Sequence, residues 1–361
     1  MQLRPAVVAK VSQSNVNPQG VKMFKKLLAA GALLLATMSY SFAADPFKVG
    51  FVYVGPVGDH GWTFMHDVGR QAIDREFGDK VETVYVESVK YGPDAERVLN
   101  TMVAEGVDMI FTTSFGYMEQ TLKVAKENPD VLFEHATGYK TAPNMSAYSS
   151  RFYEGRYVQG VIAGTMSKTG KAGYIASFPI PEVIRGINAF YLGATSVNPD
   201  FDIDVVWVNT WYDPAKEADA AKALINQGAD IITQHTDSTA PLSVAEELGI
   251  KGFGQASDMI SFAPNTQLTS IIDQWGPYYI KRIQAALDGT WESSDTWGGM
   301  DTGMVEMAPM TNMPKDVADI AIKITKQIND GELDPFEGKF TVGELLGMSK
   351  YLPGIDAPNP N

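Results

Sequence analysis

The stretch Val49-Gly-Phe-Val-Tyr-Val-Gly-Pro-Val-Gly-Asp-His-Gly-Trp-Thr63 decides the fold of this chain. It opens with a nearly continuous apolar run, residues 49–54, as expected of a parallel strand that is covered on both faces. A glycine-rich loop, residues 55–61, then ends the strand and allows a tight turn. In open α/β sheets, ligands bind at the carboxyl ends of the strands. Asp59 and Trp62 follow this strand, so they offer a carboxylate and an aromatic face where a binding site is expected.

Beyond this stretch, strand and helix patterns alternate in two cycles of similar size. The expected strands are 48–54, 81–87, 108–112, 131–135 and 146–149, then 171–176, 203–208, 229–233, 251–254 and 268–272. The expected helices are 62–77, 95–105, 116–128, 152–168, 181–196, 214–227, 238–248, 277–287 and 315–330, and residues 297–307 are hairpin-like. Such alternation indicates parallel sheets. We therefore predict an α/β protein with two doubly wound parallel-sheet lobes.

The amino terminus predicts a secretory signal peptide with an upstream extension, residues 1–43. Lys22, Lys25 and Lys26 precede a short apolar run, residues 27–36, and small residues follow at 41–44. This order of a basic region, an apolar region and a small-residue cleavage site is typical of signal peptides. The apolar run is too short to span a bilayer, and a buried core helix fits the charged flank less well.

Composition limits the remaining possibilities. The chain has 361 residues, enough for two domains, and no cysteine. Disulfides, cysteine nucleophiles and a lipid anchor on cysteine are therefore excluded. Removal of residues 1–43 takes away five of 29 basic residues and none of 43 acidic ones, which leaves a net charge of about −19. Such a surface repels nucleic acid and anionic lipid, and it suits either a neutral or cationic small ligand or solubility alone.

Patterns for cofactors, metals and catalysis are weak or missing. The glycine-rich loop reads GxxGxxG instead of the dinucleotide fingerprint GxGxxG, and Glu87 is a poor match to its acidic partner. The four histidines, at positions 60, 66, 135 and 235, have no metal-binding spacing. No GxSxG nucleophile motif occurs. We expect no cofactor, no metal site and no enzyme activity.

Aromatic residues just past the expected strands are more informative. Trp62, Phe115 and Trp211 each follow the carboxyl end of a strand, where pockets form. Core packing is a fair alternative for any one of them, but less so for all three. Polar residues in the same kind of loop are Asp59, Thr63, Asn209, Asp237 and Asp258. Two facing rings and a buried carboxylate would hold a planar ligand that carries N–H groups.

These residues match a known family. Residues 48–340 resemble the basic membrane protein family of ABC-transporter substrate-binding proteins, which includes purine nucleoside receptor lipoproteins. The matching stretches are residues 50–54 with 59–62, then 134–138, 149–160, 181–188 and 253–258. The resemblance is strongest to periplasmic purine-binding proteins. It implies a type I periplasmic-binding fold with two lobes joined by a hinge.

The resemblance also implies a site and a division into lobes. Trp62 and Trp211 would stack on the two faces of a purine, and Asp237, or next Asp258, would read its edge. The expected ligand-binding set is Trp62, Trp211, Asp237, Asp258, Phe115, Asp59, Thr63 and Asn188. Residues 44–149 would form the first lobe, completed by about 255–290. Residues 150–254 would form the second lobe, completed by about 291–340, and residues 341–361 would be a tail.

Departures from the family narrow the expected function. The missing cysteine predicts a periplasmic protein without a lipid anchor. Asp273 stands where nucleoside-binding members have a lysine used on the ribose, Thr63 replaces an asparagine, and the 254–258 segment loses one carboxylate. We therefore expect a monomer that captures a free purine, most simply adenine, for an inner-membrane ABC permease. The alternatives are a nucleoside-binding protein, a binding protein for another planar or carbohydrate ligand, a sensor that docks on a signalling receptor, and a periplasmic hydrolase or nucleosidase.

Overall fold

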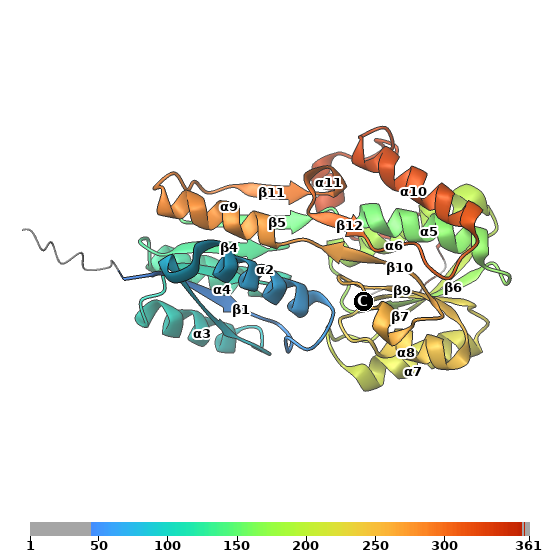
Figure 1. Cartoon of the computed structure of the whole chain (residues 1–361), viewed down its shortest axis with the longest axis horizontal. Helices are drawn as coiled ribbons and strands as arrows, with labels where there is room; N and C mark the ends of the chain where they lie inside the picture. Colours follow the sequence, from blue (N-terminus) through green and yellow to red (C-terminus); the bar gives the residue numbers. More distant parts are fainter. Residues whose placement is uncertain (1–44, 356, 358–361) are drawn as a thin grey trace, which may run out of the picture. The chain divides into compact units, whose positions relative to one another are not determined.

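The computed structural model describes residues 45–355 and 357, so the expected signal peptide lies outside the described residues. Two six-stranded sheets, each with helices on its faces, make up this part of the chain (Figure 1). None of its helices is both long enough and apolar enough to cross a membrane. The alternating strands and helices predicted from the sequence are confirmed for both sheets.

The first sheet has the strand order β11-β5-β4-β3-β1-β2, and all of its pairings are parallel. Its strands are β1 (Phe47–Val52), β2 (Val81–Val86), β3 (Met109–Thr112), β4 (Leu132–Ala136), β5 (Met145–Ser150) and β11 (Asp295–Gly298). Its helices are α2 (Trp62–Phe77), α3 (Pro93–Ala104), α4 (Met118–Glu127) and α9 (Gly276–Leu287). Four residues of β1, from Val49 to Val52, are buried, as the apolar run predicted.

The second sheet has the order β12-β10-β9-β8-β6-β7 and is parallel except for β12. Its strands are β6 (Lys171–Ala176), β7 (Asp202–Trp207), β8 (Ile231–His235), β9 (Lys251–Gly254), β10 (Gln267–Asp273) and β12 (Val305–Met307). Its helices are α5 (Tyr153–Met166), α6 (Pro181–Val197), α7 (Pro214–Asn226), α8 (Ala240–Leu248), α10 (Lys315–Asn329) and the short α11 (Val342–Leu346).

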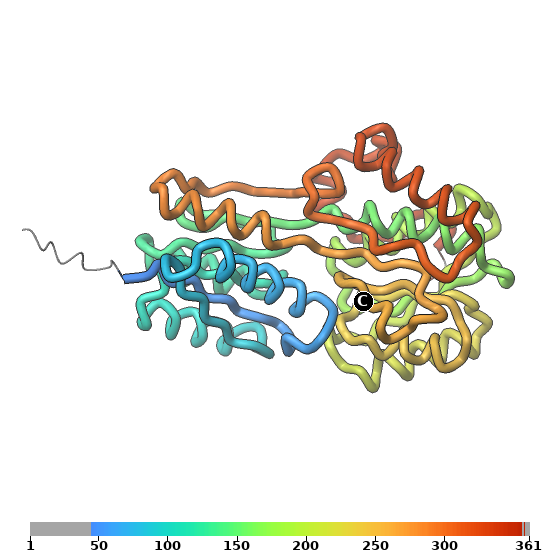
Figure 2. Tube along the Cα trace, in the orientation of Figure 1, coloured from blue at the N-terminus to red at the C-terminus, as the bar shows by residue number. Residues whose placement is uncertain are grey.

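The chain passes between the two sheets three times, after β5, after β10 and after β11 (Figure 2). The prediction of a hairpin over 297–307 is wrong, because β11 pairs with β5 in the first sheet and β12 pairs with β10 in the second. Strand β10 falls within the segment expected to complete the first lobe, yet it lies in the second sheet. Strand β11 falls within the segment expected to complete the second lobe, yet it lies in the first sheet. Alternating strand patterns do not say which sheet a strand joins.

A buried carboxylate on β4 ties the late helix α9 to the first sheet. Glu134 accepts hydrogen bonds from Tyr278 Oη at 2.7 Å, Arg282 Nε at 2.6 Å and Trp291 Nε1 at 2.7 Å. Its partners belong to α9 and to the segment that leads into β11. A buried charge is tolerated only when it is paired and hydrogen-bonded in this way. The family-like stretch 134–138 therefore begins with a residue that holds the first lobe together.

Candidate ligand-binding site

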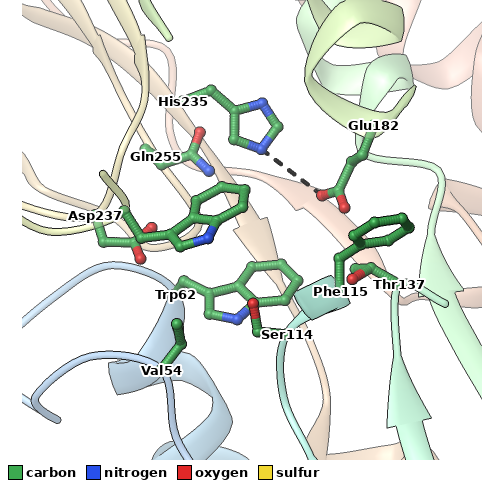
Figure 3. A pocket seen from close by; sticks show the side chains of 10 residues that line it. Val54, Trp62, Ser114, Phe115, Thr137, Glu182, His235, Asp237 and Gln255 are labelled. Atoms are coloured by element: carbon green, nitrogen blue, oxygen red, sulfur yellow. Dashed lines mark ion pairs between the residues drawn. The ribbon is translucent and has the colours of Figure 1, made fainter. Parts of the chain in front are cut away.

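One cavity lies where the carboxyl ends of the two sheets face each other, and both lobes contribute to it. Its walls are Val54, Trp62, Ser114, Phe115, Thr137, Glu182, Trp211, His235, Asp237 and Gln255 (Figure 3). Each of these residues ends a strand or follows one, as expected for ligand sites in open α/β sheets. The space between them is narrow, with room of only about 10 Å³ for the centre of a water-sized molecule.

Trp62 forms part of the wall from the first lobe. It begins α2, and its indole Nε1 donates a hydrogen bond of 2.7 Å to the carbonyl oxygen of Thr113. The ring also meets His66 and Trp275 edge to face, with centroids 4.6 and 5.4 Å apart. These contacts fix the plane of the indole. Figure 3 shows the ring with Asp237 on one side and Phe115 on the other.

Trp211 supplies an indole from the second lobe. Its ring centroid lies 5.5 Å from that of Phe178 and 6.3 Å from that of His235. Its carbonyl oxygen accepts a hydrogen bond of 2.8 Å from the amide of Asp237. Within the described residues, no ring contact joins Trp211 to Trp62 across the cavity. Both indoles therefore line the cavity, and their rings do not pack against each other.

Asp237 lies in the same wall, just after β8. Its side chain is buried, and its Oδ2 has no hydrogen-bond partner among the described residues. Burial raises the pKa of this carboxyl well above its usual range, and the nearby charges of Glu217, Glu182 and Asp273 act in the same direction. An unpaired buried polar group is costly unless a ligand completes it. Asp237 is therefore suited to hydrogen-bond the edge of a bound molecule.

A histidine and a glutamate face each other on another side of the cavity. Nε2 of His235 lies 3.7 Å from Oε1 of Glu182, which stands in the first turn of α6 (Figure 3). Burial lowers the pKa of His235, so the imidazole is neutral near pH 7. Its Nδ1 has no partner within the described part of the chain. The pair offers the cavity a further acceptor and a neutral ring.

Gln255 is oriented from behind by a buried arginine. Arg156 donates to Oε1 of Gln255, to Oγ1 of Thr233 at 2.9 Å and to the carbonyl oxygen of Gln234 at 2.6 Å. The guanidinium is fully buried and does not line the cavity. Since the amide oxygen is held, the amide nitrogen of Gln255 is turned toward the rings (Figure 3). The cavity wall thus carries two acidic side chains, a neutral histidine and neither lysine nor arginine.

The structure brings four of the eight predicted site residues together: Trp62, Phe115, Trp211 and Asp237. Asp59 is exposed and borders an outer groove. Asp258 accepts from the Ile260 amide and from Gln267 Nε2, so its carboxylate is used within its own loop. Thr63 is buried in the first turn of α2 and does not line the cavity.

Asn188 also lies away from the cavity, although the sequence places it in the site. Its Nδ2 donates to the carbonyl oxygen of Lys350 at 3.0 Å, and its Oδ1 accepts from the amide of Leu352 at 3.0 Å. Six residues of α6, about 1.7 helical turns, separate Glu182 from Asn188, so their side chains point about 120° apart around the helix axis and serve different faces. Asn188 therefore holds the C-terminal segment against α6.

Glu182, His235 and Gln255 were missed by the sequence analysis, as were Val54, Ser114 and Thr137. All of them obey the rule that singled out the tryptophans, since each ends a strand or follows one. The same rule, applied to every residue that ends or follows an expected strand, would have included them. Their side chains are too common to attract notice without that rule.

A cavity between the facing strand ends of two parallel-sheet lobes defines the periplasmic-binding-protein class of ligand-binding proteins. The chain belongs to the Bmp family, the PnrA-like ABC transporter substrate-binding proteins, whose family model matches residues 47–332. Proteins of this family are substrate-binding proteins and not enzymes: they bind a small molecule outside the cytoplasm for a permease partner. The family resemblance seen in the sequence is confirmed.

Individual relatives support this assignment. The chain is 60% identical over 333 residues to a purine-binding protein of Brucella abortus, covering 88% of this chain and 95% of the relative. It is 40% identical over 325 residues to a putative ABC transporter glucose-binding protein of Haloferax volcanii, covering 88% and 82%. An ABC transporter solute-binding protein of Aeropyrum pernix superposes with a TM-score of 0.69 at 20% identity, over 83% of this chain and 97% of that one, and shows the shared fold.

Proposed function

We propose that this protein captures a purine base, most simply adenine, in the periplasm and delivers it as a monomer to an inner-membrane ABC permease. The observation that carries the proposal is the cavity in which Trp62, Trp211 and the unpartnered carboxyl of Asp237 meet. Indole faces bind planar rings, and each base–aromatic contact contributes about 1–3 kcal/mol. The Brucella abortus relative, named a purine-binding protein, supports the same class of ligand.

The charges around the cavity favour a neutral or cationic ligand. Glu182 and Asp237 line it, whereas no lysine or arginine does. A nucleotide would bring phosphate charges beside these carboxyl groups without a cation to pair them, which is unfavourable in a buried site. Nucleosides and free bases carry no such charge. The proposal therefore excludes nucleotides as tight ligands.

The protonation of Asp237 favours adenine over guanine. A neutral carboxyl group presents one O–H donor and one acceptor side by side, whereas a carboxylate presents acceptors alone. The edges of adenine pair one N–H donor with one ring nitrogen acceptor, so they match the neutral form. The N1–H and amino groups of guanine are two adjacent donors and match the ionised form. Because burial raises the pKa of Asp237 well above its usual range, the neutral form persists to higher pH than in an exposed aspartate.

A thermal-shift and calorimetry series tests the proposal on the chain from Ala44 onward. The ligands are adenine, guanine, hypoxanthine, adenosine, AMP and glucose, the last because one relative is named as a putative glucose-binding protein. A ligand that binds the folded state raises the melting temperature by mass action. Adenine should give the largest shift among the bases, and AMP should give none. A shift with glucose and none with any purine would overturn the proposal.

A further inference from the structure

A C-terminal segment, residues 333–355, follows α10 and lies beyond the part of the chain that the family model matches, which ends at residue 332. It contains the short helix α11, which Figure 1 shows beside the end of β11. Phe336, Leu345 and Met348 of this segment are buried in an apolar cluster with residues of α5 and α6. The segment, which we name the strap, is therefore packed on the second lobe.

The strap accepts a hydrogen bond from a buried arginine of α6. Arg185 is only 3% exposed, and its Nη1 donates to the carbonyl oxygen of Leu345 in α11 at 2.6 Å. The guanidinium also contacts two rings, with its central carbon 5.8 Å from the ring centroid of Tyr153 and 5.1 Å from that of Trp297. A buried guanidinium is costly unless acceptors pair it. The Leu345 carbonyl therefore helps to keep the Arg185 side chain in this position.

The same turn of α6 carries a residue of the ligand cavity. Glu182 lies three residues before Arg185, so the two side chains are neighbours on one face of the helix. Both border one recess beside the cavity, together with Leu346 of the strap. Burial lowers the pKa of Arg185, and the nearby charge of Glu182 acts in the opposite direction. Since Glu182 also faces His235 across 3.7 Å, the first turn of α6 connects the cavity wall to the strap.

The strap has a second attachment to α6 that does not reach the cavity. Asn188 donates to the carbonyl oxygen of Lys350 and accepts from the amide of Leu352, both at 3.0 Å. Its side chain points about 120° away from that of Glu182 around the helix axis. Two attachments of the same segment therefore differ in whether they lie next to a cavity residue. This difference allows an effect on stability to be separated from an effect on the cavity.

We propose that the strap positions Glu182 in the ligand cavity through Arg185. Leu345 fixes the guanidinium, and its positive charge attracts the Glu182 side chain that faces His235 and the ligand. Among the described residues, none of the strap lines the cavity, so the strap acts without touching the ligand. Arg185 is a positioning residue in this arrangement. The inference deepens the proposed function and rests on it where adenine is the probe.

A double-mutant cycle measured by calorimetry with adenine tests the connection. Arg185→Met removes the charge and the hydrogen bond to Leu345, and we expect adenine affinity to fall at least about fivefold. In a Glu182→Gln background the same change should cost less than about twofold, because no charge is left at position 182 to attract. Leu345→Ala loosens α11 but keeps Arg185, so its loss should be smaller and should depend on Glu182 in the same way. Equal losses in both backgrounds would overturn the inference.

Proton NMR of the ligand-free protein provides a test that needs no ligand. The chain has four histidines, and His235→Asn identifies the signals of the His235 ring. Displacement of Glu182 in Arg185→Met or Leu345→Ala should shift these signals, because the two side chains face each other. Asn188→Ala is the matched control and should lower stability without changing the signals or adenine affinity. Signals that stay in place in both strap variants would overturn the inference. Shifted signals in an unmodified protein background that does not bind adenine would refute the proposed function alone.

Discussion

The backbone of Gly61 in the first lobe lies directly against the carbonyl oxygen of Asp237 in the second: a Cβ atom at position 61 would lie 2.3 Å from that oxygen. Gly61 also donates from its amide to Ser257 Oγ at 2.8 Å. Next to it, the His60 ring meets the Phe262 ring edge to face, with centroids 4.9 Å apart. The loop before α2 therefore packs directly on the second lobe beside the cavity.

Replacement of Gly61 by alanine should weaken ligand binding. The added methyl group would collide with the Asp237 carbonyl, and the φ of 94° at Gly61 disfavours any side chain. We expect adenine affinity to fall by at least about tenfold, measured by calorimetry. Gly58→Ala is the matched control, because Gly58 has a φ of 56° in the same loop and nothing lies within 4 Å of its Cβ position. Equal losses in both variants would mean that backbone strain, and not the contact with Asp237, explains the effect.

Replacement of Trp62 by alanine should remove stacking from the first lobe. Loss of about 1–3 kcal/mol corresponds to a Kd for adenine that is about 5-fold to 150-fold higher. Trp62→Phe keeps an aromatic face but loses the bond to Thr113, so its loss should be smaller. Tyr85→Ala, at an exposed position on β2, is the control. Adenine affinity that stays at the unmodified value in Trp62→Ala would remove Trp62 from the site.

Replacement of Asp237 by alanine should weaken adenine binding, whereas replacement by asparagine should largely keep it, because the amide offers a donor beside an acceptor as the neutral carboxyl does. The asparagine variant should also stabilise the free protein at neutral pH. The raised pKa of Asp237 means that the folded state holds its proton at pH values where the unfolded chain has released it. Stability from this group is therefore present below the unfolded pKa and is lost as pH rises through the folded pKa. The ligand-free variant should melt at a higher temperature than the unmodified protein at pH 7, with the difference vanishing near pH 4.

Melting curves across pH, together with adenine titrations, measure both effects. Asp59→Asn is the control for binding, because Asp59 is exposed and does not line the cavity. If adenine pairs with the neutral carboxyl, the affinity of the unmodified protein should also fall as pH rises through the pKa of Asp237. A pH-independent affinity would argue against the donor role of that carboxyl. Unchanged affinity in Asp237→Ala would place the purine edge elsewhere.

Replacement of Asn188 by alanine should lower stability without changing ligand affinity. The side chain holds the Lys350 carbonyl and the Leu352 amide, and their loss leaves backbone groups unpaired at a cost of about 1–3 kcal/mol. Denaturant unfolding measures the change in the free energy of unfolding, and calorimetry with adenine measures binding. A loss of adenine affinity at unchanged stability would show that Asn188 takes part in ligand binding.

The sequence predicted the sheet-and-helix alternation well, because each strand is an apolar run and each helix carries its own periodicity. Val49–Val52 and the break at the following glycines are an example. It failed on the pairing of β11 and β12, since pairing depends on contacts between residues far apart in the chain. For the same reason it could not place Asn188, whose partners lie about 160 residues further along the chain.

Only four of the eight predicted site residues line the cavity, because residue type alone does not fix surroundings. Trp62 and Trp211 stood out because large aromatic residues are uncommon just past a strand, whereas Gln255 and Thr137 did not. The raised pKa of Asp237 comes first from burial and then from the charges of Glu217, Glu182 and Asp273, which lie on three elements that the sequence alone does not bring together. Residue type indicates what a position can do, but burial and neighbours decide whether it does so.

The three passages of the chain between the sheets have a consequence for how the protein is made. The outer strand of the first sheet, β11, is synthesised after five of the six strands of the second sheet, and the last strand of the second sheet, β12, follows it, so neither sheet is complete before Asp295 has been made. A chain that stops short of Asp295 lacks an edge of both sheets. Each lobe is thus a product of the complete message, and no single cut divides the gene into two halves that encode one lobe each.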